Sequence, residues 1–168
     1  MNERAEANLR RSRARRRCGE IELVTADAVD WKIPPDLTIA YMYCPFTGVV
    51  FERVIRNLLA SVDEHPRRLR LVYNYPVEHS LLIRTGRVRV LDVVKGGWPA
   101  RSGPADAIVT YLALPRDREL AGEYAAHFPQ RVDGAEQWLG EYEPGFVLEK
   151  PKRLGGVVVQ RPASSSRS

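Results

Sequence analysis

The stretch Leu37-Thr-Ile-Ala-Tyr-Met-Tyr-Cys-Pro-Phe-Thr-Gly48 decides the expected fold of this chain. Its apolar run is typical of a strand that is buried on both faces, as the strands of a parallel sheet are. Pro45 cannot donate a hydrogen bond to a neighbouring strand, so the strand must end at this point. We therefore expect Cys44-Pro45-Phe46 at the carboxyl end of a central strand, which is the edge where open α/β sheets bind ligands.

The residues that follow predict a helix and then a second strand. Across residues 49–64 apolar side chains recur at helical spacing, with Thr47 as the expected N-cap and His65-Pro66 as the stop. Residues 69–75 then predict a strand, which Pro76 ends. The two expected strands and the helix between them are typical of a parallel pair with a crossover.

The rest of the chain continues this alternation. Further helices are expected at residues 3–17, 77–85 and 116–127, and further strands at residues 21–25, 88–94, 107–114 and 157–160. The loop between the strands at 88–94 and 107–114 is rich in Gly and Pro and has no helical pattern. We therefore expect an antiparallel hairpin at one edge of an otherwise mostly parallel sheet, in an α/β layered domain.

Composition is that of a soluble globular protein. The chain has 168 residues, of which 44% are hydrophobic and 28% charged. No segment approaches the roughly 20 apolar residues of a membrane span, and the N-terminus lacks a signal-peptide pattern. Cys18 and Cys44 give neither a disulfide framework nor the spacing of zinc ligands. We therefore expect a cytoplasmic protein.

The net charge of +5 is unevenly distributed, because seven arginines fall within residues 4–17. The segment Arg10-Arg11-Ser12-Arg13-Ala14-Arg15-Arg16-Arg17 is interpreted either as a helix that binds nucleic-acid phosphates or as a solvated helix face. No aromatic or base-reading residue lies between the arginines, and this favours the solvated face.

Three stretches, taken in order, resemble the second half of a class I S-adenosylmethionine-dependent methyltransferase, which has a Rossmann-like α/β fold. Ile21-Glu-Leu-Val-Thr-Ala-Asp27-Ala28 resembles the third strand of that family and the residues after it. Tyr43-Cys44-Pro45-Phe46 resembles the fourth-strand motif, and Leu71-Val-Tyr-Asn-Tyr-Pro76 resembles the fifth strand. The late hairpin resembles the reversed last strand, so the resemblance covers roughly residues 3–114.

The resemblance implies an enzyme that uses S-adenosylmethionine and an unidentified methyl acceptor. Asp27 and Ala28 would contact the adenine, since a carboxylate can accept from its amino group and a backbone N–H can donate to a ring nitrogen. Tyr43 would lie on the cofactor side, and methyl transfer would occur above Cys44-Pro45-Phe46. The alternatives are a turn residue for Asp27 and a core aromatic for Phe46.

The chain departs from this family in two respects. Many members that methylate amino groups carry Asn or Asp where this chain has Cys44, which argues against a standard exocyclic-amine methylase and leaves the acceptor open. Cys44 as a nucleophile is a further alternative, but no neighbour in the sequence would lower its pKa. The Gly-x-Gly turn that holds the methionine part of the cofactor is absent. We expect either a fragment of a longer methyltransferase, with Met1 inside it, or a diverged remnant.

Four tyrosines are expected near the carboxyl ends of the two parallel strands, where they could frame a planar substrate or serve as strand residues; they are Tyr41, Tyr43, Tyr73 and Tyr75. The domain organisation expected is an incomplete methyltransferase-like domain at residues 1–114, an extension packed on it at 115–162 and a disordered tail at 163–168.

Two other functions are alternatives to the methyltransferase hypothesis. One is a small basic module that binds nucleic acid through the arginine-rich N-terminal helix. The other is a subunit that associates with another chain through exposed strand edges.

Overall fold

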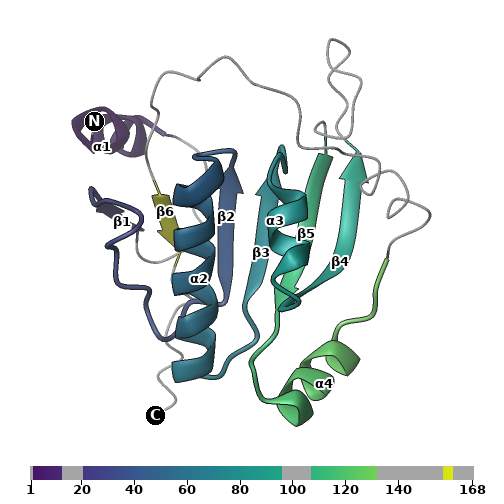
Figure 1. Ribbon diagram of the computed structural model, residues 1–168. Coiled ribbons are helices and arrows are strands. Elements are labelled where there is room, and N and C mark those ends of the chain that lie inside the picture. Colours follow the sequence, from purple (N-terminus) through teal and green to yellow (C-terminus); the bar gives the residue numbers. More distant parts are fainter. Residues whose placement is uncertain (1, 13–20, 96–106, 132–156, 161–168) are drawn as a thin grey trace, which may run out of the picture.

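A four-stranded mixed sheet forms the centre of the computed structural model, which describes residues 2–12, 21–95, 107–131 and 157–160. Its strands, in spatial order, are β2 (Ile39–Tyr43), β3 (Arg70–Asn74), β5 (Ala107–Ala113) and β4 (Val88–Lys95). The helices around it are α2 (Gly48–Glu64), α3 (His79–Arg84) and α4 (Arg118–His127). In Figure 1, α2 and α3 lie over the same face of the sheet. Within the described residues, the strands and α2 to α4 expected from the sequence are all present.

The sheet is mixed, and the prediction of a mostly parallel sheet was wrong. Only β2 and β3 form a parallel pair, whereas β5 is antiparallel to both β3 and β4. The reversed strand therefore lies inside the sheet, and not at an edge as expected. The physical reason is composition: β5 is uncharged and mostly buried, whereas β4 carries Arg89 and Asp92, which suit an edge position.

The prediction that β2 is a central strand buried on both faces was also wrong. It is the other edge strand of the sheet, and Ile39, Tyr41 and Tyr43 are 47, 55 and 62% exposed. Met42 is buried in the core, on the face that packs against α2. An unbroken apolar run shows that a strand can be buried on both faces, but it does not show that another element covers the second face. The tyrosines on that face tolerate contact with solvent.

The main core lies between the sheet and the two helices on this face. The apolar stripe of α2 contributes Phe51, Ile55, Leu58, Leu59 and Val62, all buried. Tyr73 of β3 and Tyr111 of β5 are fully buried opposite it, and the Tyr73 ring stacks on Phe51 at 5.4 Å. On the other face of the sheet, a second cluster joins Tyr124 of α4 to Leu91 and Leu112.

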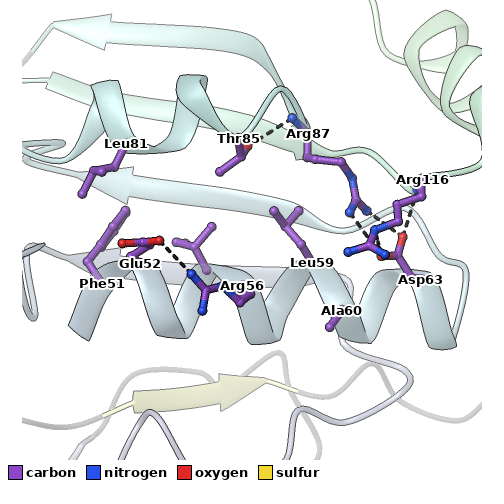
Figure 2. Close-up of a pocket in the computed structure, with 11 residues that line it drawn as sticks. Phe51, Glu52, Arg56, Leu59, Ala60, Asp63, Leu81, Thr85, Arg87 and Arg116 are labelled. Atoms are coloured by element: carbon purple, nitrogen blue, oxygen red, sulfur yellow. Dashed lines mark hydrogen bonds and ion pairs between the residues drawn. The ribbon is translucent and has the colours of Figure 1, made fainter. Parts of the chain in front are cut away.

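Two side-chain clusters tie the ends of these elements together. Arg67 closes the C-terminal end of α2, because its guanidinium donates to the carbonyl oxygens of Leu37, Ser61 and His65 at 2.7–2.8 Å. Asp63 accepts from both terminal nitrogens of Arg87 at 2.6 and 3.1 Å and from the backbone N–H of Arg116 at 2.9 Å (Figure 2). The end of α2 is thereby joined to the start of β4 and the chain after β5.

The remaining described elements lie beside the sheet and do not belong to it. They are α1 (Asn2–Arg11), β1 (Ile21–Val24) and β6 (Val157–Gln160), and β1 pairs antiparallel with β6. The helix expected at residues 3–17 ends at Arg11, and residues 13–17 lie outside the described residues. So do the hairpin loop at 96–106 and the tail at 163–168.

Candidate functional site

The carboxyl ends of β2 and β3 lie side by side, because Tyr43 is paired with Asn74 in the parallel register. Each strand is followed by a residue in the left-handed region and then by a proline. The φ angles of Cys44 and Tyr75 are 35° and 60°. A non-glycine residue in this region costs about 1–2 kcal/mol, and such residues cluster at functional sites. This pair of strand ends is therefore the candidate site.

The thiol of Cys44 is half-buried between the strand end and the start of α2. Burial raises its pKa, and the carboxylate of Glu78 raises the pKa further. A raised pKa keeps the sulfur in the neutral thiol form at neutral pH, which is not the nucleophilic form. The geometry therefore argues against the alternative that Cys44 is a nucleophile.

The side chain of Glu78, which follows β3, bonds to the backbone of Gly48, which follows β2, and so links the segments after the two strands. It lies at the N-cap of α3, and its Oε1 accepts a hydrogen bond of 2.5 Å from the backbone N–H of Gly48, the first residue of α2. Thr47 occupies the N-cap position of α2, as predicted, but its side chain makes no capping hydrogen bond. A carboxylate from 30 residues further along the chain thus caps the helix that follows Cys44.

The side chains around Cys44 divide between the two faces of the sheet. Phe46 packs against the main core, with its ring centroid 6.4 Å from that of Phe51. Tyr43 is 62% exposed on the opposite face, and Pro45 is exposed. Phe46 is thus largely the core aromatic that the sequence left as an alternative, and Tyr43 is the aromatic group open to a ligand.

Only two of the four tyrosines expected at this edge are open to solvent. Tyr41 and Tyr43 are exposed on one face of β2, whereas Tyr73 is fully buried in the core and Tyr75 is half-buried. The Nδ2 group of Asn74 donates to the hydroxyl of Tyr41 at 3.0 Å. Of the two roles that the sequence left open, Tyr73 takes that of a strand residue in the core, and Asn74 takes a place at this edge that sequence reasoning missed.

A buried polar pair lies beneath α3. The Nδ1 atom of His79 is 2.7 Å from the hydroxyl of Tyr111, and these residues are 8% and 0% exposed. Burial lowers the pKa of His79, and burial together with Tyr73 raises the pKa of Tyr111 well above its usual value. Both groups are therefore neutral at neutral pH. The sequence does not predict this pair, because the two residues are 32 positions apart.

The structure does not bring Asp27 and Ala28 to these strand ends. Asp27 is exposed, and its Oδ1 accepts from the backbone N–H of Val29 at 2.9 Å, the turn role that the sequence left as an alternative. The carbonyl of Val29 accepts from Asn57 at 2.7 Å, which ties this turn to the middle of α2. Asn57 lies nine residues beyond Gly48, or about 13 Å along the helix.

Of the arginine-rich segment, only its first three residues are described. Arg10 and Arg11 end α1, and Arg10 forms an exposed ion pair of 3.1 Å with Glu6. This ion pair offsets the positive charge of Arg10, one of the two positive charges at the end of α1. No observation on the described residues favours nucleic-acid binding over a solvated helix face.

No family model, curated protein or solved structure matches this chain. In the part of the chain that the structure describes, no helix is long and apolar enough to cross a membrane. The same residues contain no group of three His, Cys, Asp or Glu side chains that could hold a metal ion.

Proposed function

We propose that this chain forms the acceptor-side part of an S-adenosylmethionine-dependent methyltransferase, with methyl transfer above the strand end at Cys44-Pro45-Phe46. The observation that carries the proposal is the strand order β2-β3-β5-β4 with β5 reversed. The resemblance implies two parallel neighbouring strands, a fourth and a fifth, followed by a reversed last strand. β2, β3 and β5 take these places in the same order.

The residues at the strand ends suit a cationic methyl donor. The exposed ring of Tyr43 can lie against a sulfonium ion, and the carboxylate of Glu78 contributes negative charge beside Cys44. A sulfonium is a good leaving group, so the protein mainly has to hold the acceptor in line with the methyl group. Two rigid strand ends that meet in a parallel pair support that positioning role.

The adenosine end of the donor fits less well. In the proposal it is held by Asp27 and Ala28, whose turn is tied to the middle of α2 and not to the strand ends. The chain also contains no Gly-x-Gly turn for the methionine part. We therefore expect S-adenosylmethionine to bind this chain alone only weakly, with a dissociation constant on the order of 1 mM.

The proposal is tested by an NMR titration of the ¹⁵N-labelled chain with S-adenosylmethionine. We expect the amide signals of Tyr43, Cys44 and Gly48 to move, and Tyr43→Ala to weaken binding by about fivefold. Ile39→Ala is the matched control, because Ile39 is exposed on the same face at the other end of β2.

Each alternative outcome has a separate meaning. Amide shifts that avoid the strand ends, or an equal loss of binding in Ile39→Ala, would contradict the proposed site. Micromolar binding would instead show that the expectation of a weak donor site is wrong. The methyl acceptor stays unassigned, since Cys44 supplies neither a strong donor nor a strong acceptor.

A further inference from the structure

A groove runs between α2 and α3 (Figure 2). Its volume is about 220 Å³, below the roughly 300–1,000 Å³ of pockets that hold drug-sized ligands. The bottom of the groove is apolar: Phe51, Ile55 and Leu59 of α2 reach it from the core and are almost fully buried, and Leu81 of α3 is half-buried beside them. These dimensions suit a small ligand with an apolar body.

One end of the groove carries more positive than negative charge. Arg87 and Arg116 both contact the single carboxylate of Asp63, as Figure 2 shows. Arg87 is committed to this contact, because both terminal nitrogens donate to Asp63 and its Nε donates to the carbonyl of Leu114. One guanidinium neutralises the carboxylate, so the second leaves a surplus positive charge.

That surplus charge belongs to Arg116. Its side chain is 83% exposed, and its Nε lies 3.4 Å from Oδ2 of Asp63. Further along the groove Arg56 pairs with Glu52 at 2.8 Å, so that stretch of the rim is neutral. Charge therefore singles out one end of the groove, and an occupant would place its negative group there.

We propose that this groove binds a short unbranched fatty acid, with its carboxylate on Arg116 and its hydrocarbon chain between α2 and α3, over Leu59 and Leu81. The guanidinium fork matches a carboxylate, which can accept two parallel hydrogen bonds. The groove follows the axis of α2 from Asp63 to Phe51, about 18 Å of helix, so an extended chain fits its length. The small volume limits the ligand to a short chain.

The test is an NMR titration of the full chain with octanoate, with octan-1-ol and octylammonium as probes of the same chain length. We expect octanoate to move the signals of Leu59, Leu81 and Thr85, and octan-1-ol to bind at least about fivefold more weakly. Octylammonium is expected to bind more weakly still. Equal binding of octanoate and octan-1-ol would overturn the role of the charge.

Two variants locate the site. Arg116→Gln removes the surplus charge and is expected to weaken octanoate binding about fivefold, whereas Arg118→Gln, exposed and outside the groove, is expected to leave it unchanged. Ala60→Phe places a large side chain at an exposed position of the groove wall, and we expect it to abolish binding without unfolding α2. Equal effects of the two arginine variants, or full binding by Ala60→Phe, would refute the site.

A protein occupant would give a different result. If a second copy of the chain covers this groove, sedimentation will show a dimer that dissociates in Ala60→Phe and that octanoate does not displace. That outcome, or no shift of the groove signals at about 10 mM octanoate, would overturn the proposal.

Discussion

Cys44 and Tyr75 occupy left-handed backbone conformations at adjacent strand ends, each before a proline. The sequence predicts both strand ends, because Pro45 and Pro76 cannot continue a ladder. It does not predict the positive φ angles, since a residue before proline ordinarily adopts an extended conformation. At the second of these positions, the Tyr75 N–H donates to the carbonyl of Ala107 on β5 at 2.9 Å.

Replacement of Cys44 measures this strain directly. In most strands Gly is less stable than Ala by roughly 0.5–1 kcal/mol. At a φ of 35° we expect the opposite order, with Cys44→Gly more stable than Cys44→Ala by about 1 kcal/mol. Urea unfolding of the two variants gives the difference, and a more stable Ala variant would contradict the left-handed conformation.

Asp63 makes folding stability depend on acid pH. Burial by itself raises the pKa of this carboxyl, but hydrogen bonds from the Arg116 backbone and the Arg87 side chain, with the charges of both, lower it overall. Its contribution is therefore complete above the unfolded pKa of about 3.9 and is lost as pH falls through the lower folded pKa.

Asp63→Asn is expected to destabilise the protein by about 2 kcal/mol at neutral pH, since Asn cannot replace all three hydrogen bonds. It should also flatten the loss of stability below about pH 4. Urea unfolding across this pH range is the measurement. Glu64→Gln, an exposed change of the same charge one position on, is the control and is expected to change neither quantity.

At the scale of elements, α2 is the part that sequence reasoning describes best. Its apolar residues recur with helical spacing over four turns, and the helix found, Gly48–Glu64, agrees with the range expected to within one residue. Its cap was not predicted, because Glu78 reaches Gly48 from outside the helix. Local patterns thus specify the helix, while the group that completes it comes from a distant part of the chain.

Replacement of Glu78, which caps α2, and of Thr47, which occupies the N-cap position without capping it, is therefore expected to have different effects on stability. Glu78→Gln should lower the free energy of unfolding by about 1 kcal/mol, because it removes a charged acceptor from the N-terminus of α2. Thr47→Ala should change it by less than about 0.5 kcal/mol, since the Thr47 side chain makes no capping bond. Thermal unfolding compares them, and a larger loss in Thr47→Ala would contradict the remote cap.

At the scale of the whole molecule, the strands and two of their three pairings were predicted, β2 with β3 and β4 with β5, but the pairing of β3 with β5 was not. The order β2-β3-β5-β4 depends on pairings between distant segments, and no periodicity within one strand contains that information. The same holds for the candidate site. Cys44 and its strand end were identified from the sequence, whereas the Glu78–Gly48 and His79–Tyr111 contacts join residues 30 and 32 positions apart.

The exposed face of β2 predicts self-association. Ile39, Tyr41 and Tyr43 are exposed along an edge strand that contains no charge and no proline. We expect the apparent mass in sedimentation to rise with concentration, and Ile39→Lys to suppress the rise. Ile83→Lys on α3, at a similarly exposed position, is the control. Equal suppression by both variants would assign association to another surface.

The hydrogen bonds that Arg67 donates at the end of α2 have a consequence for the order in which the chain folds. They close a unit of consecutive residues, 37–74, in which α2 connects the parallel strands β2 and β3, whose paired residues are 31 positions apart. β5 pairs with β3 through residues that are 34–42 positions apart, and α3 and β4 lie between them in the chain, so this pairing brings together a longer stretch of chain. We expect residues 37–74 to organise first, and β5 with its partner β4 to add late to the free edge of β3. A nascent chain that ends before Ala107 would expose the edge of β3 that later pairs with β5. At that stage of synthesis the chain is most open to chaperones and to aggregation.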